Sequence, residues 1–425
     1  MKASHRFAIV SFLALLLSAL AAAQTSFTVV KIPGSAANTP IAINNSSQVV
    51  VNSTVNGISQ VSIWDRVHGA EILGVTGTNI AAADLNNSAL VVGAGDPNHS
   101  GDQQAFVWQS VSGAQWLGSL GGALSAASGI NDGGSVVGLS YTSANLQHAF
   151  LWTQAGGMQD LTPSLTSLGG AAAEAINSSG QVVGYYFPNG SNNTLGFVWT
   201  QAGGLQNLGS AGTLAFAINN SGTVVGKTIV ASGYKHAFSW SPTTGIVDLG
   251  TLGGSSSSAL GISNKGWVVG NSLTSTGSGL LHGFLWTPSA GMSDFTVLAG
   301  VSKSQQTYAA QANDFGVIAV SSNAGSYVLI PKMIGVVASS ANPSVLGQAV
   351  TFTVTISSIA GPPPDGEVVQ FYVSGKLAGS GSLKGGVAQF TSSTITAGSH
   401  VIQARYNGDE NYLAYKYSLT QVVNP

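Results

Sequence analysis

Hydrophobic residues between positions 24 and 330 fall into short segments separated by Gly, Asn and Ser, without helical spacing. One copy of the pattern has its segments at 215–219, 223–226, 236–240 and 245–249. Such segments are too short for helices, and they are rich in Val, Ile, Phe and Trp, as strands are. The Asn-x-Ser-Gly run after the first segment is turn chemistry, in which Gly222 can take a positive φ. The pattern therefore predicts four short strands per copy.

The same pattern returns seven times, and each copy carries three anchor positions. The first anchor falls at Asn44, Asn86, Asn131, Asn177, Asn219, Ser263 and Asn313, with steps of 42 to 50 residues. The second falls at Trp64, Trp108, Trp152, Trp199, Trp240, Trp286 and Leu329. The third falls at Leu73, Leu117, Leu161, Leu208, Leu249 and Phe295. Four strands in a period of roughly 44 residues are typical of one blade of a β-propeller.

The two ends of the repeat region complement each other. The seventh copy has only three segments before the composition changes at Pro331, while 27–30 is an extra strand ahead of the first copy. Val30 precedes Asn44 by 14 residues, the same step as from Leu117 to Asn131. A propeller hides its sheet edges when the N-terminal strand completes the last blade. We predict a seven-bladed β-propeller over 24–331; six or eight blades, or an open solenoid of hairpins, are the alternatives.

Beyond Pro331 the period stops. Apolar residues alternate with Thr over 350–356, and further strands are predicted at 368–373, 377–383, 387–391, 400–406 and 415–422, with Gly- and Pro-rich turns between them. About 90 residues with this many strands predict an Ig-like β-sandwich over 332–425. At the other end, a basic start, an apolar stretch and Ala21-Ala22-Ala23 predict a signal peptide over 1–23, and hence a secreted or cell-surface protein.

The composition limits the kinds of partner that the protein is expected to bind. There is no Cys, so stability must come from apolar burial and backbone pairing. Charged residues make up 7% of the chain, with a net charge of −2 and the basic residues scattered singly, which argues against nucleic acid as a partner. No apolar run after the signal peptide is long enough to span a membrane. We expect a monomer whose partner is a glycan or a cell-surface or extracellular protein.

Residues that recur in register are expected to serve the scaffold. The six anchor Trp should be core between blades. Trp116 and Trp267 fall outside the pattern and are freer to make surface contacts, although core is the favoured interpretation for them too. Asp160, Asp248 and Asp294 occupy matching positions, as do His148, His236 and His282. A catalytic residue is normally unique, while a repeated polar residue usually bonds a backbone turn. No catalytic residue and no cofactor site are predicted.

One loop has the spacing of a calcium site. Asp96, Asn98, Ser100 and Asp102 place oxygen ligands on alternate positions, with Gly101 sixth. Position twelve, where a bidentate Glu is wanted, is Val107, and no helices flank the loop. A polar hairpin turn is the alternative interpretation. Of the unique carboxylates, Asp84 and Glu174 are candidates for an enzyme, although they lie in different copies without local clustering.

Two families resemble parts of the chain. H-A-F-L-W at 148–152, A-x-x-I-N-x-x-G-x-V-V-G at 173–184 and the L-G-G runs at 120–122 and 252–254 resemble the bacterial extracellular repeats named after their His-Ala-Phe (HAF) signature. N-P-S-V-L-G-Q-A-V-T-F-T-V from Asn342 resembles bacterial Ig-like domains. The resemblance implies a secreted protein with an Ig-like spacer or adhesion module. It supplies no active-site residue, and the copies at 61–64 and 326–329 depart from the signature.

Three functions remain open from the sequence. The first is a secreted, non-catalytic propeller that binds a glycan or protein, with the Ig-like domain as spacer or second contact. The second is an enzyme acting on extracellular polysaccharide, with carboxylates gathered at the propeller axis. The third is a structural surface or matrix protein. Because the repeats account for the scaffold, we expect function in the loops where the copies disagree, at 96–103, 187–194, 272–279 and 299–306.

Overall fold

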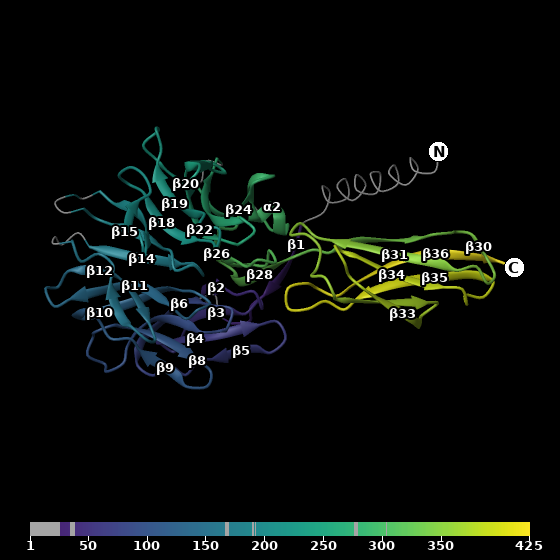
Figure 1. Cartoon of the computed structure of the whole chain (residues 1–425), viewed down its shortest axis with the longest axis horizontal. Coiled ribbons are helices and arrows are strands. Elements are labelled where there is room, and N and C mark those ends of the chain that lie inside the picture. The colour runs from purple at the N-terminus through teal and green to yellow at the C-terminus, as the bar shows by residue number, and fades with distance from the viewer. Residues whose placement is uncertain are drawn as a thin grey trace. The chain divides into compact units, whose positions relative to one another are not determined.

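The protein is described by a computed structural model that covers residues 26–34, 39–165, 170–188, 191, 193–275, 279–302 and 304–425. The predicted signal peptide at 1–23 lies outside these residues. The chain forms two compact units, one spanning Val29–Leu329 and one that contains Ile330–Pro425 (Figure 1). Both are built from strands, and each is described by itself.

Within the described residues, the first unit contains seven four-stranded sheets. Six of them are made of four consecutive strands in the order in which the chain runs. The first strands of the seven sheets are β2 (Thr39–Ile43), β6 (Thr78–Leu85), β10 (Gly121–Ile130), β14 (Ala171–Ile176), β18 (Leu214–Ile218), β22 (Gly253–Ile262) and β26 (Thr307–Ala312). The second strands are β3 (Val49–Val55), β7 (Val91–Asp96), β11 (Val136–Thr142), β15 (Val182–Tyr186), β19 (Val224–Ile229), β23 (Val268–Thr274) and β27 (Ile318–Ser322).

The outer strands continue the same order. The third strands are β4 (Ile58–Asp65), β8 (Gln104–Gln109), β12 (Gln147–Thr153), β16 (Leu195–Thr200), β20 (Lys235–Ser241), β24 (Leu281–Thr287) and β28 (Gly325–Pro331). The fourth strands are β5 (Gly69–Ile72), β9 (Gly113–Trp116), β13 (Gly157–Asp160), β17 (Gly204–Asn207), β21 (Gly245–Gly250) and β25 (Gly291–Asp294), and a short helix, α2 (Phe295–Ala299), follows β25. The four predicted segments per copy are confirmed as strands.

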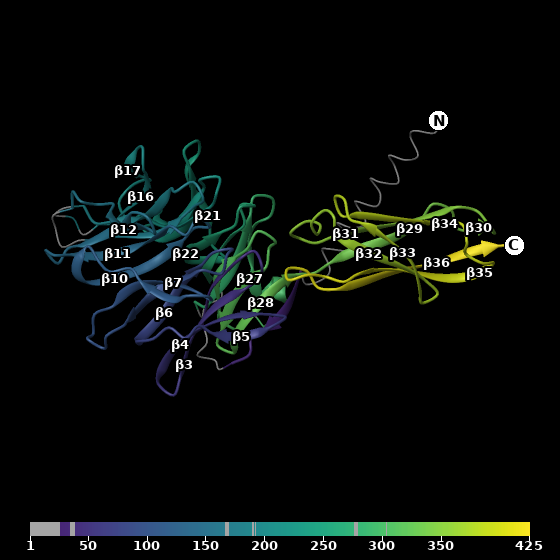
Figure 2. The same cartoon turned by 60° about the horizontal axis from the view of Figure 1, so that its bottom comes forward.

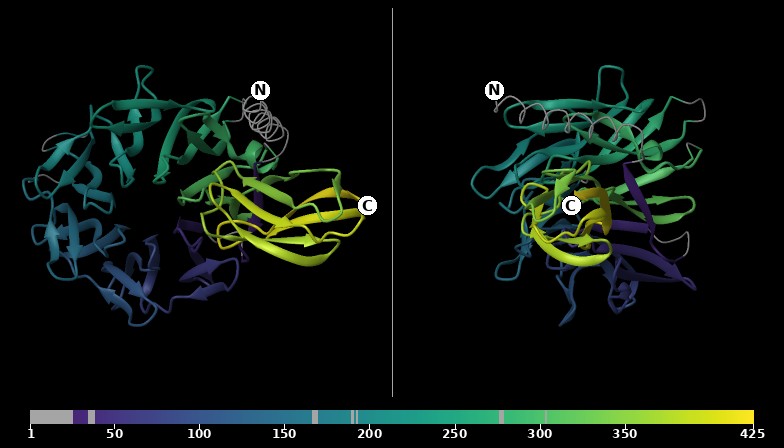
Figure 3. Two further views of the ribbon diagram at one scale, coloured as in Figure 1. Left: turned by 45° about the vertical axis from the view of Figure 1, so that its right-hand side comes forward. Right: turned by 90° about the vertical axis from the view of Figure 1, so that its right-hand side faces the viewer.

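The last sheet joins the two ends of the repeat region. Its order is β1-β28-β27-β26, with β1 (Phe27–Lys31) beside β28. The predicted pairing of the N-terminal strand with the seventh copy is therefore confirmed. The pairing covers the edge of β28, which would otherwise offer unpaired backbone groups to other chains. The left panel of Figure 3 shows the sheets arranged around a common axis, so the unit is propeller-like.

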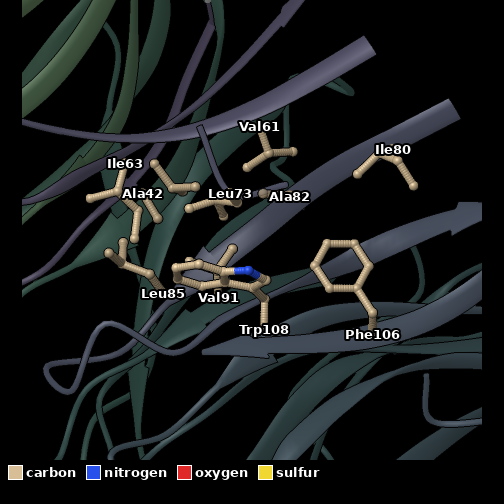
Figure 4. Close-up of a cluster of buried hydrophobic side chains, with 11 residues drawn as sticks. Ala42, Val61, Ile63, Leu73, Ile80, Ala82, Leu85, Val91, Phe106 and Trp108 are labelled. Atoms are coloured by element: carbon tan, nitrogen blue, oxygen red, sulfur yellow. The ribbon is translucent and has the colours of Figure 1, made fainter. Parts of the chain in front are cut away.

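Neighbouring sheets pack face to face through shared hydrophobic clusters. One cluster joins the β2–β5 sheet to the β6–β9 sheet, with Leu73 and Ile63 from the first and Phe106 and Trp108 from the second (Figure 4). Similar clusters join the following sheets pairwise. Burial of aromatic rings dominates the energetics of such interfaces. The sheets are thus held together by the residues that the repeat preserves.

The tryptophans follow this packing. The anchors Trp64, Trp108, Trp152 and Trp199 are buried, and Trp240 and Trp286 are partly buried against the clusters between later sheets, as expected. The favoured interpretation of Trp116 and Trp267 as core residues is confirmed. Trp116 packs edge-on against Phe106, with ring centroids 5.6 Å apart, and Trp267 is only 9% exposed. Both extend the core beyond the anchor positions, because the ends of the strands also need apolar cover.

The Gly of each Val-Val-Gly run is required by a close approach between strands. A Cβ atom on Gly184 would lie 2.0 Å from the carbonyl oxygen of Ala172 on the first strand. The Phe of the His-Ala-Phe signature lies opposite this Gly: Phe197 pairs with Gly184, and Phe150 with Gly138. These rings are fully buried, so each occupies the space beside its Gly. The Val-Val-Gly run and the His-Ala-Phe signature, which are separate in the sequence, therefore pack together through their Gly and Phe residues.

The first copy departs from both motifs together. Val51 stands in the place of the Gly and pairs with Ser62, which stands in the place of the Phe. A larger residue opposite a smaller one roughly conserves the packed volume, the kind of exchange that cores tolerate best. The last copy pairs Val320 with Tyr327 instead. The irregular signature of the first copy is thus a compensated change within the same fold.

The second unit is a sandwich of two sheets. One sheet contains β29 (Ile334–Ser339), β31 (Val350–Ser357) and β34 (Val387–Ser392), and the other contains β30 (Ser344–Val345), β36 (Tyr415–Asn424), β35 (Gly398–Tyr406), β32 (Val368–Val373) and β33 (Lys376–Ser382) (Figure 2). The apolar residues of β31 are buried and alternate with partly exposed Thr and Ser, as the sequence predicts. Phe352 and Phe371, one from each sheet, are fully buried. The sandwich therefore has its own core.

The close approach at Gly184 makes a testable prediction. Gly184→Ala should lower the free energy of unfolding by more than about 3 kcal/mol, because the new methyl group meets backbone that cannot move aside. Urea unfolding followed by Trp fluorescence measures this in the first unit alone, since every Trp lies between residues 64 and 286. Gly133→Ala is the control, since its Cβ would meet only the Asn131 side chain, at 3.3 Å. Equal stability of the two variants would contradict the packing account.

Candidate functional site

A ring of Asn side chains ties each first strand to the next sheet. The Nδ2 group of Asn44 donates to the backbone oxygen of Asn86, and Asn86 donates in the same way to Asn131. The chain of bonds continues through Asn177 and Asn219 to Ser263, at distances between 3.0 and 3.2 Å. Asn313 closes it by donating to Asn44 O at 3.1 Å. Only the link from Ser263 is absent among the described residues, because Ser has no amide nitrogen.

The same Asn side chains also shape the turns that follow them. The Oδ1 atom of Asn177 accepts the backbone N–H groups of Ser179 and Gln181 at 3.1 and 3.0 Å. The expectation that the Asn anchor satisfies turn amides is confirmed. The bond to the next sheet was not predicted, although an invariant Asn at a strand end carries both a donor and an acceptor. One side chain therefore fixes its own turn and the neighbouring sheet.

The residues after the Asn anchors form a second ring. The backbone N–H of Asn220 donates to Asn264 Oδ1, and that of Asn264 donates to Asp314 Oδ1 at 2.7 Å. Asp314 N–H closes this ring by donating to Asn45 Oδ1 at 3.0 Å. Among the described residues, the backbone N–H of Asp132 makes no such bond to Ser178, the next position in the ring, because the Ser side chain is shorter than that of Asn or Asp. Both rings run through the same end of the propeller-like unit.

A polar cavity of about 160 Å³ lies on the axis inside these rings. It is lined by the ends of all seven first strands and the turns after them, which shows that the first strands are the innermost ones. Its described lining includes the carboxyl groups of Asp84, Asp132 and Asp314, and no Lys, Arg or His. The axis therefore brings together acids that are far apart in the sequence.

Each of these carboxylates already bonds the scaffold. Asp84 accepts the N–H groups of Leu85 and Ile130, at 2.9 and 3.1 Å. Asp132 accepts the backbone and side-chain N–H groups of Asn87, both near 3 Å. Desolvation raises the pKa of Asp84 to about 7, and the negative charge of Asp132 adds to the rise. The two hydrogen bonds lower the pKa but do not offset the desolvation. Asp84 and Asp132 thus form a carboxylate pair at the axis, and their oxygens accept hydrogen bonds from the scaffold.

The repeated His and Asp residues pair within the three sheets that carry them. His148 Nδ1 lies 2.7 Å from Asp160 Oδ2, and His236 and His282 are paired with Asp248 and Asp294 in the same way. The Asp carboxylates also accept backbone N–H groups of the following turn, for example that of Thr162. Their predicted structural role is confirmed. The pairing itself was missed, although the constant spacing of 12 residues could have revealed it.

The predicted calcium loop is organised by a single carboxylate. Asp96 is buried, and its oxygens accept the backbone N–H groups of Asn98, Ser100 and Gly101 at 2.7 to 3.2 Å. Burial opposes ionisation, but these hydrogen bonds, led by the one from Gly101, lower the pKa of Asp96. The Asp102 N–H donates to Ser100 Oγ. Within the described chain no three His, Cys, Asp or Glu side chains gather to hold a metal, and calcium at this loop stays a prediction.

The two ends of the first unit differ in regularity. Because paired strands are antiparallel, successive connections alternate between the two ends of each sheet. The turns after first and third strands share one end, which we call the turn face. The turns after first strands all have five residues: 44–48, 86–90, 131–135, 177–181, 219–223, 263–267 and 313–317. In the six sheets whose fourth strand follows the third in sequence, the turns after third strands all have three residues: 66–68, 110–112, 154–156, 201–203, 242–244 and 288–290. The turn face is uniform.

The opposite end, which we call the loop face, carries the connections that differ in length from sheet to sheet. Connections after second strands range from two residues at 56–57 to eight at 187–194, and α2 lies in the connection before β26. The predicted variable loops 96–103, 187–194, 272–279 and 299–306 all belong to this face. Residues 189, 190, 192, 276–278 and 303 within them lie outside the described residues. Loops that vary over a regular scaffold are the usual carriers of binding function.

Two positions on the first and second strands hold residues that no other copy has. One is the bulge of the first strand, occupied by Glu174 in β14 and by Phe216 in β18. The other lies on the second strand toward the loop face, occupied by Tyr185 and Lys227. Phe187 follows at the end of β15, with its ring 6.4 Å from that of Tyr185. We call these five residues the Glu174 cluster.

The polar groups of the Glu174 cluster have no hydrogen-bond partner within the described chain. The Glu174 carboxyl, the Tyr185 hydroxyl and the Lys227 ammonium are all partly buried. Desolvation raises the pKa of Glu174 to about 7; it also raises the pKa of Tyr185, to which the charge of Glu174 contributes. Desolvation, with the charge of Lys235, lowers the pKa of Lys227. Lys227 Nζ lies 5.4 Å from the centre of the Phe216 ring.

Comparison with known families identifies the second unit. Residues 337–424 match the model of the bacterial Ig-like domain (group 3), as the motifs in this segment predict. Among curated proteins, none matches the sequence. In the part of the chain that is described, no helix is long and apolar enough to cross a membrane.

Several solved structures are similar to the chain at low identity. TolB from Acinetobacter baumannii is 15% identical over 49% of this chain and 53% of its own, with a TM-score of 0.39, so the chain spans about half of the TolB structure. A virginiamycin B lyase from Staphylococcus aureus is 10% identical over 71% and 98%, with a TM-score of 0.48. A gluconolactonase from Xanthomonas campestris is 11% identical over 74% and 92%, with a TM-score of 0.40. Likeness at this level says nothing about activity.

The Asn ring predicts a graded loss of stability. Asn131→Ala should lower the free energy of unfolding by about 2 kcal/mol, because it removes the bond to Asn177 and the acceptor for Ser135 N–H. Asn131→Ser should cost about half as much, since Ser263 stands in the ring naturally and its hydroxyl oxygen accepts Trp267 N–H. Denaturant unfolding measures both. If the alanine variant is as stable as the wild type, the ring does not hold the sheets together.

The raised pKa of Asp84 predicts a pH effect. The folded protein binds this proton more tightly than the unfolded chain, whose Asp has a pKa of 3.8, so the resulting stability is present at low pH and is lost as pH rises through about 7. Relative to the wild type, Asp84→Asn should therefore gain about 4 kcal/mol of stability between pH 4 and pH 8. The measurement is the difference in unfolding free energy across this range. A difference that does not change with pH would show that Asp84 titrates normally.

Proposed function

We propose that this chain is an extracellular, non-catalytic binding protein. In this proposal 24–331 form a closed seven-bladed β-propeller that presents its loop face to a glycan or protein. The Ig-like domain at 332–425 serves as spacer or second contact. The observation that carries the proposal is the contrast between the two faces, with uniform turns on one and connections of different length on the other.

Export is part of the proposal. The predicted signal peptide at 1–23 and the resemblance of the repeats to the HAF family support a secreted or cell-surface location. The bacterial Ig-like domain at 337–424 agrees with it. We infer a monomer in solution, since the pairing of β1 with β28 leaves no repeat strand unpaired at the ends of the array.

An enzyme remains the second candidate because of the axial carboxylates. Asp84 and Asp132 line one cavity, and the pKa of Asp84 is raised to about 7, a value suited to proton transfer at neutral pH. Against this, the oxygens of both residues accept hydrogen bonds that hold neighbouring sheets. A binding role needs no free acid at the axis, and we favour it.

Binding to immobilised bacterial cell-wall, extracellular polysaccharide and surface-protein fractions tests the proposal. Exposed apolar residues provide matched variants: Ile58→Asp and Tyr234→Asp on the loop face, and Val67→Asp and Val111→Asp on the turn face. We expect saturable binding that the loop-face changes weaken about tenfold or more, as interface residues do, and that the turn-face changes leave intact. The opposite pattern would move the site to the turn face.

The other outcomes identify the alternatives. Self-association at modest concentration, without saturable binding to any fraction, would favour the structural-protein alternative and reject the proposal. Turnover of a polysaccharide that is lost in Asp84→Asn would favour the enzyme.

A further inference from the structure

The Glu174 cluster differs from the rest of the axis in that the fold does not use its polar groups. At the position of Tyr185 and Lys227, two other sheets have Asn. Asn52 donates to Ala82 O and accepts Ala82 N–H, both at 2.9 Å, and Asn271 accepts Ala309 N–H. These Asn residues bind the next first strand. Tyr185 and Lys227 make no such bond, so their presence is not explained by holding the sheets together.

Keeping these groups is costly for the folded state. A partly buried polar group without a partner gives up hydration and receives no hydrogen bond in return. Four other sheets avoid this cost at the bulge position, which holds Ile41, Ala83, Leu260 or Ala310. Sequences tend to break their own structural rules where a ligand binds. The cluster is therefore a place where three polar groups from two neighbouring sheets are left without a partner in the fold.

The register places the cluster between the axis and the loop face. Glu174 lies three residues before Asn177, and thus above the ring of Asn side chains. Tyr185 pairs with Ala172, one step nearer the loop face, and Phe187 N–H bonds to Gly170 O beyond the end of β15. Phe216 and Lys227 repeat the Glu174 and Tyr185 positions on the adjacent sheet. Two neighbouring sheets thus present one set of side chains to whatever enters from the loop face.

The chemistry of the set favours a neutral ligand rich in hydroxyl groups. The carboxyl of Glu174 accepts hydrogen bonds, the ammonium of Lys227 donates them, and the hydroxyl of Tyr185 does both. A ligand with a strong positive or negative charge would meet a like charge at one end of the set. Aromatic rings, here Phe187 and Phe216, supply flat apolar surfaces against the C–H face of a sugar ring. These properties match a pyranose unit.

We propose that the Glu174 cluster binds a neutral hexose unit of a polysaccharide. Glu174, Tyr185 and Lys227 bind its hydroxyl groups, and Phe187 and Phe216 contact its apolar face. The proposal rests on the loop-face function above and names the ligand class and the residues that recognise it.

Calorimetric titration of the full chain with separate sets of oligosaccharides tests this. The neutral probes are glucose, mannose and galactose oligomers, and the charged probes are galacturonate and glucosamine oligomers. We expect at least one neutral oligomer to bind, and Glu174→Leu and Lys227→Met each to weaken it about tenfold or more, because each removes a charge-assisted hydrogen bond. Glu71→Leu and Lys376→Met, which change exposed residues elsewhere, should leave binding intact.

A measurement of stability separates a binding role from a structural one. If Glu174 serves only the ligand, Glu174→Leu should unfold at the same temperature as the wild type or a higher one. A clear fall in the unfolding temperature of both Glu174→Leu and Glu174→Gln would assign the residue to the scaffold and overturn the proposal. The glutamine variant keeps the side-chain shape, so it tests the role even if leucine prevents folding.

The failures of the two proposals can be told apart. Binding of charged oligomers alone would overturn the neutral-sugar assignment. Binding of a neutral oligomer that is unaffected by Glu174→Leu and Lys227→Met, but lost in Tyr234→Asp, would place the site elsewhere on the loop face and leave the proposed function standing. No binding of any oligomer, with saturable capture of a surface protein by the loop face, would overturn the sugar proposal alone.

Discussion

The hydrogen bond from the Asn side chain at the end of one first strand to the backbone of the next sheet is the constraint on which the repeat unit depends. A four-stranded sheet with both faces apolar is not stable alone, so it must be held against a neighbour on each side. Apolar packing provides the attraction, but it does not by itself fix the height of one sheet relative to the next. The Asn ring does, because it bonds backbone to side chain at the same level in each sheet, from Asn44 around to Asn313 and back. Its closure depends in turn on β1, which completes the last sheet.

This constraint divides the residues of the unit into two groups. The Asn anchors, the His–Asp pairs and the Gly–Phe contacts are each satisfied within the fold and recur from sheet to sheet. Most of their bonding groups are used within the scaffold. The residues that remain are those at which the copies differ, and the strand directions collect the variable connections on one face. The Glu174 cluster lies beneath that face and keeps a carboxyl, a hydroxyl and an ammonium free of the scaffold. The Ig-like domain adds an independent module with its own core.

The sequence allowed the strands, the pairing of the N-terminal strand with the last copy and the Ig-like domain to be predicted, because each rests on local patterns. Alternation and turn residues report on strands directly, and the step from Val30 to Asn44 reports on closure. The sequence did not reveal contacts that depend on the register between sheets. Asp84 and Asp132 are 48 residues apart, and only the ring brings them to one cavity. The pairing of His148 with Asp160 was within reach, because a sheet that lacks the His, with Leu195 in its place, also has Asn207 in place of the Asp.

Hydrogen exchange of the full chain, with and without a mixture of neutral gluco-, manno- and galacto-oligosaccharides, tests the division between scaffold and site most directly. Exchange reports the opening of backbone segments and locates the contact without any substitution. The account predicts slower exchange within 170–188 and 213–230, which carry the Glu174 cluster, and no change in the Asn turns at 44–48, 131–135 and 313–317. Protection of the Asn turns with no change at 170–188 would contradict it, because the ligand would then bind the part of the molecule that we assign to the scaffold.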